Sequence, residues 1–283
     1  MQDKLNDSTN LRFHEKRIHK MLHIIKIGGN VLDNPPLLEH FVSEFAALLG
    51  PKILVHGGGV MASQLQEDMG MEPVMIEGRR VTDQETLRVV TMVYAGWANK
   101  SLVALLQGAG CNAMGLAGCD ANLICANRRP PIDINGEMTD FGFVGDVQAE
   151  SVNAQQIMAL LNLGITPVFS AINHDGKGSL LNTNADTMAA SIAKAMAAET
   201  DVKLTFCFEK PGVLLDRDDD DSVIPTITPD TYKQLKADGV VAAGMIPKLD
   251  NAFAAIAAGV KSVEIKHAAD LRYATGTTLI SPQ

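Results

Sequence analysis

Cysteine is scarce in this sequence, and its placement argues against both disulfide and zinc chemistry. Four cysteines occur among 283 residues, and none belongs to a CxxC pair or has a histidine at zinc-finger spacing. We therefore expect Cys111, Cys119, Cys125 and Cys207 to be free thiols in a reducing cytosol. Neither a metal site nor a disulfide framework is predicted.

The chain also lacks an excess of positive charge and any long apolar run. Its formal net charge is -9 and its pI is near 5.2, which argues against a broad contact surface for nucleic acid or an anionic membrane. No apolar run reaches the ~18–20 residues that span a bilayer, and the N-terminus has no signal-peptide core. We expect a cytoplasmic protein that binds small molecules and neither nucleic acid nor membrane.

Two common nucleotide-binding motifs are missing as well. The sequence has no Walker A element, GxxxxGK followed by Ser or Thr, and no glycine fingerprint with an acidic residue at the spacing of a dinucleotide-binding fold. A P-loop NTPase and a Rossmann oxidoreductase are therefore disfavoured. The acidic run Asp218–Asp221 lacks the spaced ligands of an EF-hand and is typical of a solvated hairpin tip.

What the chain does have is a regular alternation of short β-branched runs and longer periodic stretches. Strands predicted at His23–Ile27 and Lys52–His56 are each followed by a helix, at Leu37–Leu49 and Val60–Met69. The order β-α-β-α implies parallel strands with helices on both faces. With 46% hydrophobic residues, the chain can bury a substantial core.

The remainder of the chain continues this pattern. A long helix is predicted over Asp83–Gln107 with Thr82 as its N-cap, and hairpins are predicted within Ala117–Gly145 and Gly212–Ile227. The other predicted elements are helices at 152–163, 184–197, 229–238 and 245–258 and strands at 111–116, 166–171, 202–207, 262–265 and 278–280. The sequence thus predicts an α/β fold, a three-layer α/β/α sandwich with a central, mainly parallel sheet, preceded by a polar N-terminal extension at 1–20.

Two glycine clusters follow the first two predicted strands. Lys26-Ile27-Gly28-Gly29 ends the first strand and His56-Gly57-Gly58-Gly59 the second, so both clusters lie at the carboxyl edge of the sheet, where ligands bind. Glycine turns that open helices let backbone N–H groups approach an anion. Either cluster alone is equally typical of a tight turn, but a lysine at the end of a buried strand indicates a phosphate ligand, because an unpaired buried ammonium is costly.

These motifs and four others resemble the acetylglutamate kinases. KIGG, VHGGG, GRRVT (Gly78–Thr82), AGWANK (Ala95–Lys100), LLNTNAD (Leu180–Asp186) and GMIPK (Gly244–Lys248) occur in order from about Met21 to the end of the chain. The KxGG turn is shared by the wider amino-acid kinase family, whereas VHGGG, GxRVT and NxNAD together select the acetylglutamate branch. The resemblance implies the amino-acid kinase fold over 21–283, with an acylglutamate-binding lobe at 21–185 and an ATP-binding lobe at 186–283.

The resemblance also assigns roles to individual residues. It implies that Lys26 and Lys248 neutralise charge on the transferring phosphoryl group and that Asp186 orients both lysines, where its alternative is a helix-start aspartate favoured by the dipole. The implied substrate-binding residues are Gly58, Gly59, Arg80 and Asn182. The implied nucleotide-binding residues are Gly28, Gly29, Glu209, Gly212 and Gly244, with Mg²⁺ arriving on ATP.

The activity implied is the ATP-dependent phosphorylation of the side-chain carboxylate of N-acetyl-L-glutamate to N-acetylglutamyl 5-phosphate, the second step of arginine biosynthesis, by a homodimer. Two positions depart from the family pattern. Phe208-Glu209-Lys210 replaces the usual Ser-Asp-Val before Pro-Gly, and Arg79 replaces an apolar residue beside Arg80. Alternatives therefore remain open: N-succinyl-L-glutamate as substrate with Arg79 or Lys210 on its extra carboxylate, another amino-acid kinase activity, or a silent amino-acid or nucleotide sensor.

Overall fold

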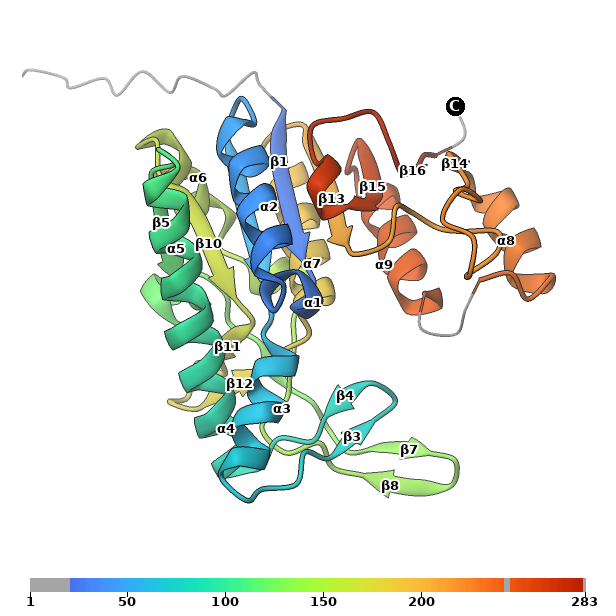
Figure 1. Cartoon of the computed structure of the whole chain (residues 1–283). Coiled ribbons are helices and arrows are strands. Elements are labelled where there is room, and N and C mark those ends of the chain that lie inside the picture. The colour runs from blue at the N-terminus through green and yellow to red at the C-terminus, as the bar shows by residue number, and fades with distance from the viewer. Residues whose placement is uncertain (1–20, 242–244, 282–283) are drawn as a thin grey trace, which may run out of the picture.

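The computed structural model describes residues 21–241 and 245–281, and the N-terminal extension lies outside them. Eight strands of these described residues form the central sheet (Figure 1), and all neighbouring strands run parallel except β15 and β16. In spatial order they are β14 (Thr226–Ile227), β16 (Thr277–Leu279), β15 (Ser262–His267), β13 (Val202–Phe208), β1 (Leu22–Ile27), β2 (Lys52–His56), β10 (Thr166–Ser170) and β5 (Ala113–Leu116). The prediction of a mainly parallel sheet is confirmed.

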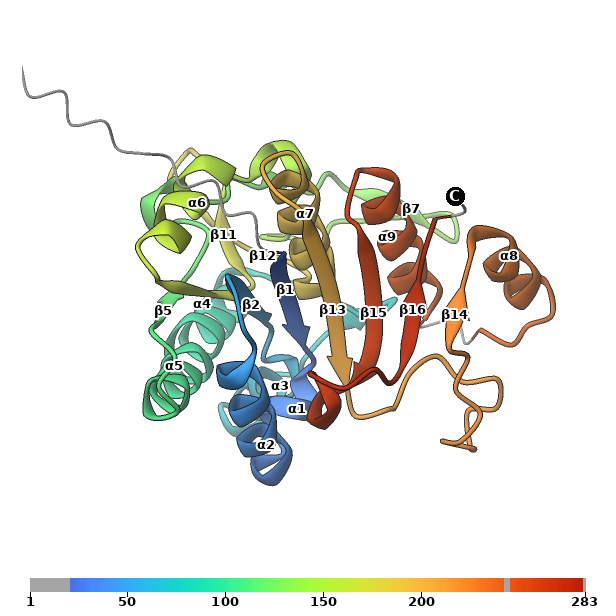
Figure 2. The same ribbon diagram turned by 90° about the horizontal axis from the view of Figure 1, so that it is seen from above.

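Helices cover both faces of this sheet, as Figure 2 shows. One face carries α2 (Pro35–Ala47), α5 (Asn99–Gly108) and η4 (Ala268–Asp270), and the other carries α6 (Ala154–Asn162), α7 (Ala185–Ala197) and α9 (Ile246–Ala257). The alternation of β1 explains the two cores, because Leu22 and Ile24 point to the α7 side while Ile25 and Ile27 point to the α2 side. The three-layer α/β/α sandwich is therefore confirmed.

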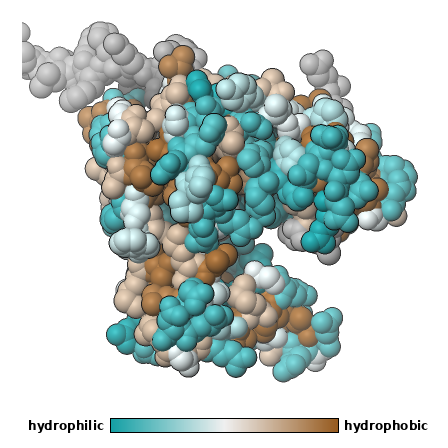
Figure 3. Space-filling view, in the orientation of Figure 1, coloured by the Kyte–Doolittle hydropathy of each residue, from teal (hydrophilic) through white to brown (hydrophobic). Residues whose placement is uncertain are grey.

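Smaller elements extend the fold beyond the carboxyl edge of the sheet. The short helix α1 (Gly29–Leu32) and α3 (Gly59–Asp68) begin at the glycine clusters. Four antiparallel strand pairs lie nearby: β3–β4 (Met75–Ile76, Arg79–Arg80), β6–β9 (Asn127–Arg128, Gly145–Asp146), β7–β8 (Ile132–Ile134, Glu137–Thr139) and β11–β12 (Ile172–His174, Leu180–Asn182). The space-filling view shows a deep notch between β3–β4 and β7–β8 on one side and the C-terminal elements on the other (Figure 3).

The predicted long helix is present, but its geometry and its cap differ from the prediction. It runs through α4 (Gln84–Thr91), the π-helical segment η1 (Met92–Ala98) and α5. Its N-cap is Asp83, which accepts a hydrogen bond from the Thr86 N–H at 2.8 Å. The Thr82 hydroxyl instead accepts from the Asn182 amide and donates to the Arg80 carbonyl, so Thr82 does not cap the helix. This helix is long and apolar enough to cross a membrane, yet it packs within the domain against α3, β5, β10 and α2.

The prediction of a hairpin at Gly212–Ile227 is confirmed only in part. Within it, Leu214 and Val223 form a single antiparallel bridge, and β14 pairs instead with β16 of the central sheet. Two backbone hydrogen bonds flank this bridge, from the Leu215 N–H to the Ser222 carbonyl at 2.9 Å and from the Ile224 N–H to the Val213 carbonyl at 2.8 Å, and the acidic run at 218–221 lies exposed at the tip between them. The remaining helices in the described part of the chain are α8 (Pro229–Ala237), η2 (Asp120–Asn122) and η3 (Ala149–Ser151). All four cysteines are free, as predicted.

Candidate active site

The two glycine turns lie side by side at the carboxyl edge of the sheet. Strands β1 and β2 are neighbours, with Ile27 opposite His56, so Gly28 and Gly57 follow at the same level. A Cβ atom added to Gly29 would lie 3.6 Å from the Val60 side chain and 3.9 Å from the Gly59 nitrogen. The prediction that both clusters meet at one edge is confirmed, and the second cluster lines a cavity.

The first cavity, here called the glycine-turn cavity, has a volume of about 180 Å³. Its lining combines the second glycine turn with β4, β12 and the start of α7: Gly57, Gly58, Gly59, Met75, Gly78, Arg79, Arg80, Tyr94, Val144, Ala171, Asn182, Thr183, Asn184 and Ala185. The four residues that the sequence assigned to substrate binding, Gly58, Gly59, Arg80 and Asn182, all belong to it. They come from three separate segments, which only the tertiary fold brings together.

Arg80 is fixed in this cavity by hydrogen bonds to α3. Its guanidinium donates to the Gly59 carbonyl at 2.9 Å and the Ser63 hydroxyl at 2.7 Å, and it also donates to the Gln66 side-chain oxygen. These bonds use three of the five N–H donors of arginine. The guanidinium is therefore held in one orientation and retains donors suited to a carboxylate.

Asn182 and Arg80 are linked through Thr82. The Asn182 side chain donates to the Thr82 hydroxyl at 3.0 Å, and that hydroxyl donates to the Arg80 carbonyl at 3.0 Å. All three residues are at most 7% exposed. The RVT and NTN parts of two distant motifs thus form one buried chain of hydrogen bonds, which fixes the spacing between Arg80 and Asn182.

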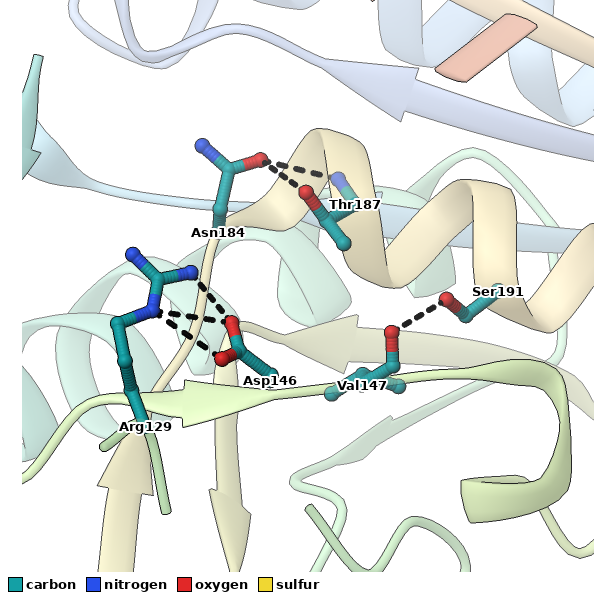
Figure 4. A network of polar contacts seen from close by, with 6 residues as sticks. All are labelled: Arg129, Asp146, Val147, Asn184, Thr187 and Ser191. Atoms are coloured by element: carbon teal, nitrogen blue, oxygen red, sulfur yellow. Dashed lines mark hydrogen bonds and ion pairs between the residues drawn. The ribbon is translucent and has the colours of Figure 1, made fainter. Parts of the chain in front are cut away.

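Lys26, Asp186 and Lys248 come together between the two cavities. The Lys26 ammonium lies 2.7 Å from an Asp186 carboxylate oxygen, and both side chains are almost fully buried. Asp186 occupies the first turn of α7, whose N-cap Asn184 accepts from the Thr187 N–H at 2.9 Å (Figure 4). The Lys248 ammonium, from α9, lies 3.9 Å from the centroid of the Phe208 ring, and the Lys26 ammonium lies 5.2 Å from it.

The charges of this group act on one another. Burial lowers the pKa of Lys248, and the nearby Lys26 ammonium lowers it further, whereas the Asp186 and Glu209 carboxylates raise it. Phe208 carries the negative face of its ring toward both ammonium groups, which is an attractive arrangement. The Asp186 and Glu209 carboxylates and the Phe208 ring therefore offset the repulsion between two like charges that lie close together.

The second cavity, here called the Phe208 cavity, has a volume of about 280 Å³. Its lining mixes cations with apolar side chains: Phe208, Glu209, Lys210, Gly212, Val213, Leu214, Arg217, Val240, Val241, Met245, Lys248 and Ile265. Glu209 accepts a hydrogen bond from the Asn30 amide at 2.8 Å, which ties this cavity to the first glycine turn. Gly28 lies against Phe208, while Gly244 lies outside the described residues.

Several residues of the site were not assigned from the sequence. Tyr94 lines the glycine-turn cavity, and it precedes the AGWANK motif directly, so the motif's position was an available signal. Arg129 pairs with Asp146 (Figure 4), and both charges act on Arg79 in the lining of the cavity. No motif marks that pair, because Arg129 and Asp146 face each other only after β6 and β9 align.

Comparison with known proteins places the chain in a family. A model of the amino acid kinase family matches residues 21–267. The acetylglutamate kinase of Cytophaga hutchinsonii is 53% identical over 250 residues, which cover 88% of this chain and 92% of that protein. The chain belongs to the amino acid kinase family. The acetylglutamate kinase of Methanopyrus kandleri, which is 42% identical over 256 residues covering 90% of this chain and 99% of that protein, is a second relative.

Solved structures of similar shape agree with an amino acid kinase fold. The N-acetylglutamate synthase of Neisseria gonorrhoeae, in complex with coenzyme A and N-acetyl-glutamate, matches 94% of this chain and 61% of its own chain, with a TM-score of 0.75 and 22% identity. The carbamate kinase of Giardia lamblia bound to AMP-PNP matches 93% of this chain and 99% of its own, with a TM-score of 0.66 and 17% identity. At these identities the likeness concerns the fold alone.

Proposed function

We propose that this amino acid kinase transfers the γ-phosphoryl group of ATP to the side-chain carboxylate of N-acetyl-L-glutamate, a reaction of arginine biosynthesis. The observation that carries the proposal is the arrangement of Lys26, Asp186 and Lys248 between two cavities of different character. Curated relatives named acetylglutamate kinase, at 42–53% identity over most of the chain, support the same reaction.

The acylglutamate occupies the glycine-turn cavity in this proposal. Arg80 binds the α-carboxylate with the donors that remain free of α3, and Asn182 bonds the acylamino group. Gly58 and Gly59 supply backbone N–H groups at the start of α3, where the helix dipole favours negative charge. The side-chain carboxylate of the substrate then points toward Lys26.

The reaction needs no general base. The attacking group is a carboxylate with an ordinary pKa of about 4.3, so it is already ionised at pH 7. Lys26 and Lys248 stabilise the negative oxygens of the transferring phosphoryl group, and Asp186 holds Lys26 in place. Catalysis is then a matter of positioning and of electrostatic stabilisation.

ATP occupies the Phe208 cavity in this proposal. Apolar side chains such as Val241 and Ile265 suit a nucleobase, and Lys248 and Arg217 suit phosphates. The nearby carboxylates are engaged by protein donors, Asp186 by Lys26 and Glu209 by Asn30, which fits an Mg²⁺ ion held mostly by phosphates and water. Bound in this way, Mg²⁺ neutralises part of the phosphate charge.

A second candidate substrate is N-succinyl-L-glutamate, and Arg79 favours it. Arg79 lines the glycine-turn cavity beside Arg80, and burial together with the Arg129 guanidinium lowers its pKa. A further carboxylate on the acyl group would pair with this cation. The Arg79→Ala variant tests the idea, because it should lose kcat/KM on the succinyl substrate and keep it on the acetyl substrate; equal values for wild type and variant on both would refute it.

We also propose the division into an acylglutamate lobe, 21–185, and an ATP lobe, 186–283, since the glycine-turn cavity draws almost wholly on the first and the Phe208 cavity on the second. We further propose that the protein is a cytoplasmic homodimer. The side chains of Met92, Trp97 and Leu105 expose apolar surface along the long helix, and a second copy of the chain would cover this surface. Light scattering and a Trp97→Glu variant test the dimer.

Release of ADP by the purified protein with Mg-ATP tests the reaction. N-acetyl-L-glutamate, N-succinyl-L-glutamate, free glutamate and aspartate are offered in parallel. Release with an acylglutamate alone supports the proposal and identifies the acyl group. Release with a free amino acid would point to a different amino acid kinase activity, and absence of release with all four, while ATP still stabilises the fold, would point to a sensor.

A further inference from the structure

Two residues of the shared motifs have no role in the reaction described above, and the structure brings them into contact. His56 ends β2 directly before the glycine turn, and Asn99 opens α5 after the π-helical segment η1. The His56 ring nitrogen Nε2 lies 2.9 Å from the Asn99 side-chain nitrogen, and its Nδ1 lies 2.8 Å from the Gly57 carbonyl oxygen. Both side chains are at most 1% exposed.

The hydrogen-bond partners determine the tautomer of His56. The Asn99 amide oxygen accepts from the Lys100 ammonium at 3.2 Å, and the Asn99 amide nitrogen donates to the Val168 carbonyl at 2.9 Å. Asn99 therefore presents an N–H donor to His56 Nε2, which must accept. The single proton of the neutral ring then resides on Nδ1 and is donated to the Gly57 carbonyl.

This hydrogen bond sets the direction of a peptide in the substrate-binding turn. Because a peptide unit is planar and trans, its carbonyl and the following N–H point in opposite directions. The Gly57 carbonyl is directed at His56, so the Gly58 N–H is directed away from it. Gly57 and Gly58 both line the glycine-turn cavity, where the proposed function requires backbone donors.

The π-helical segment explains how one helix reaches the turn at two points. Tyr94 packs so closely on Gly58 that an added Cβ atom would lie 2.8 Å from its ring, and Gly58 has a φ of +155°. In an α-helix, residues five apart lie ~140° apart around the axis, so Tyr94 and Asn99 would face different directions. Here the Asn99 N–H bonds the Tyr94 carbonyl, and this i→i+5 bond stacks the two residues on one side.

We propose that His56 and Asn99 are positioning residues that hold the Gly57–Gly58 peptide in its substrate-binding orientation, with η1 as the element that aligns them. The inference rests on the proposed function, because it concerns the turn that binds the acylglutamate. Burial lowers the pKa of His56 to about 4, so the ring is neutral at physiological pH and the contact does not change there. Lys100 is the charged neighbour that acts on His56.

Kinetics of Asn99→Leu, with the full chain, test the proposal. The KM for the acylglutamate should rise at least tenfold, while the KM for ATP should stay within twofold of wild type, because the Phe208 cavity is not touched. Gln107→Leu is a matched control, since the Gln107 amide also donates from α5 to a backbone carbonyl of the sheet, that of Ala113 in β5 at 2.9 Å, but lies away from the turn. A rise of less than twofold in Asn99→Leu, or an equal rise for both substrates, would overturn the proposal.

The Asn99→Asp variant adds a pH signature and a second route if Asn99→Leu does not fold. The carboxylate introduced by this substitution accepts a proton from Nε2, so the charged ring still donates from Nδ1 to Gly57. When pH rises and this ring becomes neutral, its remaining proton stays on Nε2 beside the introduced carboxylate, and the Gly57 bond is lost. The KM for the acylglutamate should therefore rise with pH between 6 and 9 in the variant and stay flat in wild type.

A third measurement is independent of activity. Nitrogen-15 NMR of the wild-type protein should show one buried histidine, absent from His56→Gln, with its proton on Nδ1. A proton on Nε2 would contradict the proposal directly. If the wild-type protein has no kinase activity, the proposed function fails. The role of the His56–Asn99 contact is still decided by the NMR result, together with calorimetric binding of N-acetyl-L-glutamate to wild type and to Asn99→Leu.

Discussion

The buried pair formed by Lys26 and Asp186 offers the sharpest test of the site. Asp186→Asn preserves the shape of the side chain and removes its charge. Lys26 would then remain buried without an anionic partner, and Lys248 would lose the carboxylate that raises its pKa. We expect the stability of the protein to fall because Lys26 is left unpaired, and kcat to fall because both lysines lose the carboxylate that places them.

The size of each effect follows from the burial. The two side chains are 8% and 12% exposed, and removal of one partner from a buried pair costs about 3–5 kcal/mol because the other charge is left uncompensated. In a chain of this length about 2 °C of Tm corresponds to each kcal/mol, so a decrease of roughly 6–10 °C is expected. Loss of precise lysine placement should lower kcat by about 100-fold.

The pH dependence of kcat distinguishes electrostatic from purely structural damage. Lys248 must be protonated to act as a cation, so its activity is lost as pH rises through its pKa. Asp186 raises that pKa, so its replacement by Asn should move the alkaline decline of kcat to lower pH. The assay is ADP release at saturating substrates from pH 6 to 10, with the fold checked at each pH by circular dichroism.

Asp201→Asn is the matched control for this experiment. Asp201 pairs with Lys261 at 3.4 Å, and both side chains are more than half exposed, so its removal should cost less than about 1 kcal/mol and leave kcat unchanged. If Asp186→Asn behaved like Asp201→Asn, or lost activity without any shift of the alkaline limb, Asp186 would not orient the lysines as proposed.

Three further perturbations address other parts of the molecule. Phe208→Leu removes the ring that lies 3.9 Å from the Lys248 ammonium and should lower kcat by about 2- to 30-fold, corresponding to ~0.5–2 kcal/mol, while Phe208→Tyr should retain activity in the same ADP-release assay. The pKa of His56 is about 4 in the fold and about 6.5 in the unfolded chain, so between pH 7 and pH 4 only the unfolded state binds the proton. Wild type should therefore lose about 3 kcal/mol of urea-unfolding free energy through His56 over this range, and His56→Gln should not show that loss. Lys52→Met should lower the urea-unfolding free energy by about 3 kcal/mol with kcat unchanged, since the Lys52 ammonium caps the carbonyls of Phe45, Ala46 and Leu48 at the far end of β2.

Much of the scaffold could be predicted from local sequence patterns. The strands β1 and β2 and the helices α2 and α3 were placed to within two residues, because hydrophobic periodicity and glycine turns are local signals. The charge of Lys26 at the end of a buried strand also indicated a ligand edge, and it is 7% exposed there. These features depend on residues a few positions apart, so a short stretch of sequence contains the whole signal.

The parts that escaped prediction depend on contacts between distant segments. β3 and β4 are two residues each, too short for a period-2 pattern, yet they carry Arg79 and Arg80 to the cavity. The hairpin expected at Gly212–Ile227 is present only around the Leu214–Val223 bridge, because β14 at its end pairs with β16, far along the chain. The π-helical geometry of η1 could not be predicted either, because its apolar pattern fits an α-helix. The i→i+5 register is favoured by packing on Gly58 and His56, which lie far away in the sequence.

Phe208, one of the positions that depart from the family pattern, bears on the repulsion between the Lys26 and Lys248 ammonium groups in the site. Two lysines share the Asp186 carboxylate, and Glu209, which also acts on Lys248, is bonded to Asn30, so two ammonium groups lie close together in a region where they are poorly hydrated. The Phe208 ring offers its negative face to both and adds no formal charge. A second carboxylate in its place would pair with Lys248 and compete with the phosphoryl oxygens for it. An aromatic ring stabilises the lysines weakly enough to leave them available, which is the property that a phosphoryl-transfer site needs.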